Sequence, residues 1–159
     1  MGGLVMDTPS TATEIKGAIS AVIAFGTAIF GWVGWVVIIW LATMLLDYLT
    51  GTWAAMSHNE WSSAIARQGL WHKLGSIVAM LVAALCDIAL SVIVGQFTLP
   101  FDYKCLITPV VALWYIFTEL GSITENAAKL GANIPPFLLR IIAKAKDAAE
   151  DAGDDISGE

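Results

Sequence analysis

Charged side chains are scarce in this sequence: they make up 14% of its 159 residues, whereas hydrophobic residues make up 57%. A soluble domain usually carries about a quarter charged residues, so the composition argues against a soluble helical bundle. The few charges are also unevenly placed, because from Asp147 onward the chain has acids and no base. We therefore predict no basic surface for nucleic acid and a solvated acidic tail at 153–159.

The sequence also lacks the side-chain groupings of enzymes and metalloproteins. Its two cysteines, Cys86 and Cys105, are too few for a disulfide scaffold and are expected to be small apolar fillers. His58 and His72 have no cysteine or carboxylate cluster at zinc-binding spacing. There is no glycine-rich phosphate loop and no nucleophile elbow. We predict no catalytic, cofactor-binding or metal-binding residue, and no cofactor.

What the sequence does have is three long apolar blocks. A helix needs about 20 apolar residues to cross a bilayer; no charge occurs between Lys16 and Asp47, and only Asp87 interrupts the second block. The first block is too long for the apolar part of a signal peptide, so we expect it to be retained. Its tryptophans, Trp32, Trp35 and Trp40, leave three alternatives open: the block begins as an interfacial helix, it extends beyond the membrane, or it faces partners.

We therefore predict an all-α membrane protein with three transmembrane helices and a cytoplasmic amphipathic helix near the C-terminus. The expected organisation is an N-terminal tail at 1–16, spans at 17–46, 74–98 and 105–126, a loop at 47–73, a connection at 99–104 and a C-terminal helical region at 127–152.

Basic residues favour the cytoplasmic side of a membrane. With three spans, the loop at 47–73 and the C-terminal region share one side. That side carries Arg67, Lys73, Lys129, Arg140, Lys144 and Lys146, against Lys16 and Lys104 on the other. We predict a multi-pass protein of the bacterial cytoplasmic membrane, with its N-terminus outside and its C-terminus inside.

Residues three and four apart share a helix face, and this spacing produces two kinds of stripe. Small residues suited to close helix association in lipid form a candidate seam in the first block: Gly17, Ser20, Ala24, Thr27, Gly31 and Gly34. Polar residues on the second and third helices form candidate pore-lining or intersubunit positions: Ser76, Asp87, Ser91, Glu119 and Ser122.

Asp87 makes the second stripe costly, because an ionised carboxylate at mid-membrane costs about 3 kcal/mol on insertion scales. Three explanations stay open: it pairs with a donor on another helix, it is protonated in a dry contact, or it faces water between several copies. Because we expect a lone copy to leave its buried acids unsheltered, we predict a homo-oligomer.

A further amphipathic pattern follows the third span. Pro135 and Pro136 end one helix and begin another, after which apolar residues recur on one face: Leu138, Ile141, Ile142, Ala145 and Ala149. Basic residues lie on or near the other side, which suits the inner membrane surface. Packing against a neighbouring subunit is the alternative.

Three segments carry a family resemblance: LDYLTGTWAAM after the first span, SSAIARQGLWHKLG before the second, and YIFTELGSITENAAKLGANIPPFLLRII closing the third. Together they resemble the phage lysis and toxin-secretion holin family. The family-pattern positions are Asp47, Thr50, Gly51, Glu119, Ser122, Glu125, Asn126, Gly131 and Pro135. The first block is richer in glycine and tryptophan, and the tail more acidic, than the family leads one to expect.

The resemblance implies a small phage-encoded membrane protein that oligomerises and, at a set time, opens lesions that release an endolysin or a toxin. We therefore expect a holin-like pore former whose partners are itself, membrane lipid and that released protein. Two alternatives remain from other classes: a small-ion channel or transporter subunit, and a non-opening antiholin or membrane scaffold.

Overall fold

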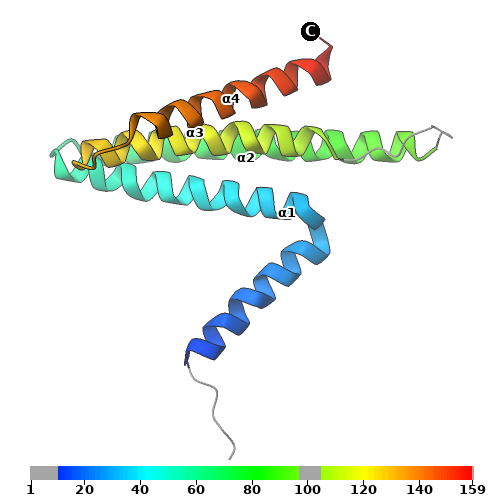
Figure 1. The fold of residues 1–159 in the computed structure, drawn as a ribbon, viewed down its shortest axis with the longest axis horizontal. Helices are drawn as coiled ribbons and strands as arrows, with labels where there is room; N and C mark the ends of the chain where they lie inside the picture. The colour runs from blue at the N-terminus through cyan, green and yellow to red at the C-terminus, as the bar shows by residue number, and fades with distance from the viewer. Residues whose placement is uncertain (1–10, 97–104, 159) are drawn as a thin grey trace, which may run out of the picture. The chain divides into compact units, whose positions relative to one another are not determined.

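The computed structural model describes residues 11–96 and 105–158, and all regular structure in these ranges is helical. The four helices are α1 (Thr11–Ser57), α2 (Ser63–Val94), α3 (Ile107–Lys129) and α4 (Pro136–Ser157) (Figure 1). This confirms the predicted all-α class. The expected connection at 99–104 and the first ten residues of the expected tail at 1–16 lie outside the described residues.

The chain divides into two compact units, Met1–Trp35 and Val36–Glu159, which we describe separately. In the first unit, α1 is interrupted at Gly31, whose φ of 57° and ψ of −143° are not helical. Glycine adopts positive φ without a steric penalty. The interruption breaks the helical spacing on which the predicted seam depended, so Gly34 follows in a different register from Gly17, Ser20 and Ala24.

Those three seam positions, Gly17, Ser20 and Ala24, are exposed, while the surroundings of the Thr27 side chain lie outside what the structure describes. Their role as an association surface therefore stays a prediction.

Three helical segments are long and apolar enough to cross a membrane: Gly31–Ser57, Ala66–Val94 and Ile107–Lys129. The first begins and ends later than the expected span at 17–46. Helix α1 continues through the start of the expected loop, and within it the hydroxyl groups of Thr50, Thr52 and Ser57 each donate to a carbonyl oxygen one turn earlier. Asp47 consequently lies within a helix and not in a loop.

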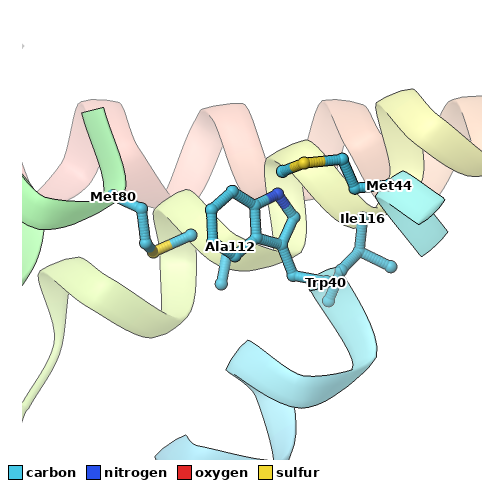
Figure 2. Packing of buried hydrophobic residues seen from close by; sticks show 5 residues of the cluster. All are labelled: Trp40, Met44, Met80, Ala112 and Ile116. Carbon is cyan, nitrogen blue, oxygen red and sulfur yellow. The ribbon is translucent and has the colours of Figure 1, made fainter. Parts of the chain in front are cut away.

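A small apolar core joins the three spans of the second unit. Trp40 and Met44 of α1, Met80 of α2, and Ala112 and Ile116 of α3 are buried together (Figure 2). Much of the remaining apolar surface is exposed, above all on α2: Val78, Leu81, Val82, Leu85, Ile88 and Val92. Exposed apolar surface of this extent is typical of contact with a membrane.

Helix α4 packs along α3 (Figure 1). It begins at Pro136, a favoured residue for a first helical turn, and Gly158 ends it in the left-handed conformation with φ of 81°. Ile142 and Ala149 are buried, whereas Ile141 of the expected apolar face is exposed. The helix continues to Ser157, so most of the expected acidic tail at 153–159 is helical.

Candidate functional site

Three charged side chains from three different helices meet in one cluster. The Nζ atom of Lys73 on α2 lies 2.9 Å from Oδ2 of Asp47 on α1 and 2.6 Å from Oε2 of Glu119 on α3. The three side chains are only 13%, 15% and 11% exposed, respectively. The side-chain amide of Asn126 donates to Oδ1 of Asp47 at 3.1 Å. We call these four residues the polar node.

A close approach of α1 and α3 positions this node. Gly51 lies one turn after Asp47, and a Cβ atom placed on it would stand 3.3 Å from Nδ2 of Asn126. A side chain at position 51 would therefore press on the amide that binds Asp47. The hydroxyl of Thr50 turns back to the carbonyl oxygens of Leu46 and Asp47 and so does not compete for the node.

The node places two carboxylates and one ammonium group within segments that can span a membrane. Each unpaired charge at the centre of a span costs about 2.5 to 3.5 kcal/mol on insertion scales. Pairing offsets this cost, and removal of one partner of a buried ion pair leaves the other uncompensated. The node therefore links α1, α2 and α3 through two ion pairs and one hydrogen bond.

An open cavity of about 230 Å³ adjoins the node. Asp47, Lys73 and Asn126 line it, together with Ser122 and Trp61. Ser122 also lines a second cavity, between α3 and α4, together with the exposed Glu125.

Asp87 makes a second polar contact, at the start of α3. Its Oδ1 atom accepts hydrogen bonds from the backbone N–H groups of Leu106 and Ile107, both at 3.1 Å. Its Oδ2 atom accepts from the N–H of Thr108 at 2.6 Å and from the thiol of Cys105 at 3.0 Å. Asp87 is 5% exposed.

These bonds explain why a carboxylate is tolerated in an apolar run. The first N–H groups of a helix have no partner within it and carry a partial positive charge. Leu106, at the N-cap of α3, makes no side-chain capping bond, and the first turn of α3 has no acid. Pro109 has no N–H, so Asp87 of α2 supplies the acceptors that the start of α3 lacks.

Cys105 is part of this cap. Burial, and then its hydrogen bond to Asp87, raises the pKa of the Cys105 thiol to about 11. The sulfur therefore keeps its proton at neutral pH and can donate it to the carboxylate. The predicted role as an apolar filler omitted this donor.

The structure gives both acids of the predicted polar stripe partners within one chain. Our inference that a lone copy could not shelter them is therefore wrong: Asp87 caps α3 and Glu119 binds Lys73. Ser76 is buried and donates to the carbonyl oxygen of Lys73, while Ser91 is exposed and donates to that of Ile88.

Sequence reasoning missed the pairing of Lys73 with Asp47 and Glu119. The available signal was the family pattern itself. Five of its positions lie at the node or its cavity in the structure: Asp47, Gly51, Glu119, Ser122 and Asn126. Two of the four other pattern positions shape the turn after α3: Gly131 has φ of 90° and Pro135 is the N-cap of α4. Nearby, Nε2 of His58 lies 3.0 Å from the carbonyl oxygen of Lys129 near the end of α3.

Within the part of the chain that the structure describes, no group of three or more His, Cys, Asp or Glu side chains could hold a metal ion. The interactions that the node shows are ion pairs and a hydrogen bond between helices.

Comparison with known proteins gives a consistent picture. The model of the bacteriophage holin family matches residues 24–147. An uncharacterized protein of Clostridium perfringens (strain 13 / Type A) is 34% identical over 112 residues, covering 70% of this chain and 76% of the relative. A "Probable holin" of Bacillus phage phi105 is 28% identical over 121 residues, covering 74% and 82%. No solved structure matches the chain.

Proposed function

Because the chain belongs to the bacteriophage holin family, we propose that it oligomerises in the bacterial cytoplasmic membrane and opens it to release an endolysin or a toxin. The family is non-enzymatic, and the three apolar helices make the chain a multi-pass membrane protein. The observation that carries the proposal is the family match over residues 24–147, because this range contains all three candidate spans and the whole polar node.

The internal contacts support a role for each chain as a preformed unit. The polar node and the Asp87 cap give the buried acids of α1, α2 and α3 hydrogen-bonding partners within one copy, so these three helices can associate before copies meet. Assembly then needs contacts between already folded bundles. The exposed small positions Gly17, Ser20 and Ala24, on α1 before the span at Gly31–Ser57, are candidates for such contacts, since small residues let helices approach closely.

The orientation follows from the distribution of basic residues. The N-terminus faces outward and the C-terminus faces the cytoplasm, because Lys and Arg are retained on the cytoplasmic side. Reporter fusions at the two ends, one active only in the cytoplasm and one only outside, test this directly. The outcome against the proposal is cytoplasmic activity of the N-terminal fusion.

Inducible expression in bacteria, with and without a cytoplasmic endolysin that lacks a signal peptide, tests the function. We expect growth to stop abruptly at a reproducible time, and turbidity to collapse only when the endolysin is present. The comparison variant is Lys73→Met, which leaves two carboxylates without their cation and should therefore delay or abolish the growth arrest. Continued growth with the wild-type chain inserted in the membrane would contradict pore formation and would favour an antiholin or scaffold.

Purified protein in lipid vesicles separates a lesion from a channel. A lesion releases a folded protein together with a small dye, whereas a small-ion channel or transporter subunit changes ion permeability and retains both. Retention of the protein cargo at high protein density would refute endolysin release.

A further inference from the structure

The position of α4 conflicts with a simple location on the membrane surface. Helix α3 can span a membrane, and α4 runs back along it. At one end of the contact Leu139 and Ile142 share a cavity with Glu125. At the other end a Cβ atom on Gly153 would lie 3.9 Å from Cγ1 of Val110. A helix on the inner surface would meet only the last turn of α3.

The contact covers most of the depth of a bilayer. Val110 and Glu125 are separated by about 22 Å along α3 at 1.5 Å per residue, against a hydrocarbon thickness of about 30 Å. Between them, the Nζ atom of Lys146 lies 4.6 Å from the ring centroid of Trp114, and Ile142 and Ala149 are buried. Helix α4 is therefore docked on α3 at depths where lipid would surround an isolated chain.

The outer face of α4 is mostly charged and so unsuited to lipid, and its exposed apolar side chains, Phe137, Ile141 and Ile156, lie near its two ends. The exposed residues on it include two bases and five acids: Arg140, Lys144, Asp147, Glu150, Asp151, Asp154 and Asp155. Charged side chains at membrane depth face water or protein, because lipid offers them no hydrogen bonds. A docked α4 thus requires an aqueous or protein environment alongside α3.

Helix α3 separates this charged helix from the apolar side of the molecule. Its face with Ala112 and Ile116 packs in the core with Trp40 of α1, and its face with Val110 and Trp114 carries α4. Beyond the core, α2 exposes a run of large apolar side chains. The apolar surface of α2 therefore lies on one side of the core, and the charged surface of α4 lies on the other side, beyond α3.

We propose that α4 forms the water-facing wall of the assembled lesion, with its charged face toward the aqueous passage and the apolar face of α2 toward lipid. This inference rests on the proposed pore function and extends it. It assigns the water-facing surface to α4, in place of the polar stripes of α2 and α3 that the sequence suggested. For the open state, this replaces the cytoplasmic C-terminus of the orientation proposed above. The acidic end of α4 then lies in the aqueous passage at the level of the start of α3, and the turn that joins the two helices stays on the cytoplasmic side.

The first test asks whether α4 is docked in the membrane. The full chain carrying Cys86→Ala and Cys105→Ser is placed in vesicles at a density that releases protein cargo. The pair Val110→Cys with Gly153→Cys should then be bridged by a short thiol cross-linker. The control pair Glu125→Cys with Gly153→Cys lies at opposite ends of the contact and should not be bridged. Failure of the first pair to cross-link would overturn the proposal.

The second test asks what the outer face of α4 meets. A spin label at Glu150→Cys should collide more often with a water-soluble nickel chelate than with oxygen. A label at Leu85→Cys, on the exposed apolar face of α2, should show the opposite preference. Preference for oxygen at position 150 would place α4 in lipid, and shielding from both reagents would place it against protein; either result overturns the proposal.

Cargo release connects position to function. The bridged Val110–Gly153 pair should release protein cargo as well as its reduced form, because the docked helix belongs to the open state. Loss of release on bridging, with recovery on reduction, would overturn the proposal and make undocking a step in opening. If both reduced and bridged protein retain the cargo while the cross-link and nickel accessibility hold, the pore function fails and the placement of α4 stands.

Discussion

Asp87 holds the start of α3 through four donors, so its replacement should loosen α3 from α2. The informative pair of variants is Asp87→Leu and Asp87→Asn. Leucine has a similar size and no acceptor, whereas asparagine keeps a carbonyl oxygen and loses only the charge. The two variants therefore separate the capping bonds from the negative charge.

The expected magnitude follows from the bonds lost. A buried donor left without an acceptor costs about 1 to 3 kcal/mol, and Thr108 is the buried one of the three backbone donors, while Leu106 is exposed. Loss of an N-cap adds about 1 kcal/mol. Asp87→Leu should therefore lower the free energy of unfolding by about 3 kcal/mol. Asp87→Asn should cost about 1 kcal/mol or less, because asparagine caps helices nearly as well as aspartate.

Denaturant titration of the purified protein in detergent, followed by circular dichroism, measures these differences. The onset of turbidity loss in bacteria measures their consequence: lysis should be delayed or lost for leucine and near normal for asparagine. If asparagine disrupts as strongly as leucine, the charge and not the cap is what matters. If leucine leaves both stability and timing unchanged, the reasoning about the cap is wrong.

Three further changes test other contacts. Lys73→Met should destabilise the helix bundle by about 3 to 5 kcal/mol, because it leaves two uncompensated buried carboxylates; Lys73→Arg should be much milder, and equal stability of the two in denaturant titration would refute the role of these ion pairs. Gly51→Ala should cost about 1 to 3 kcal/mol by overpacking against Asn126, whereas Gly69→Ala, inside α2 with open space around it, should stabilise by about 0.5 to 1 kcal/mol in the same titration. The Cys105 thiol, with its pKa raised from 9.0 to about 11, keeps its proton to higher pH in the folded chain than in the unfolded one, so stability should fall as pH rises from 9 toward 11. Alkylation at pH 9 should be slower for the folded protein than for the chain in denaturant, and equal rates would contradict the buried thiol.

The outline of this protein was readable from its sequence because hydropathy is a local property. Long apolar runs broken by few charges predict membrane-spanning helices, and three such helices are present. The resemblance at the D-Y-L-T-G and E-L-G-S-I-T-E-N segments indicated the holin family, and the family match agrees. The same local reasoning failed at the ends of helices: α1 continues past Asp47 to Ser57, because Asp47 is paired with Lys73 and Asn126 of other helices and need not lie in a solvated loop.

The pairing of polar residues was not readable, because it joins positions far apart in the chain. Lys73 pairs with Glu119, 46 positions later, and Asp87 caps a helix that begins 20 positions after it. In the sequence, Asp87 and Glu119 had no visible partners, which led to the inference that other copies must shelter them. The fold supplies those partners itself, because three helices brought side by side present donors that no periodicity reveals.

The sequence by itself determined that this chain enters membranes, since the transfer of its apolar blocks from water to lipid depends on composition alone. It also determined that α4 has charged and apolar residues at different helical positions. Only the tertiary structure decided that α4 lies along α3 and that the buried acids have hydrogen-bond donors within one chain. Both depend on which helices approach closely, as α1 and α3 do at Gly51, where a Cβ atom would stand 3.3 Å from Nδ2 of Asn126.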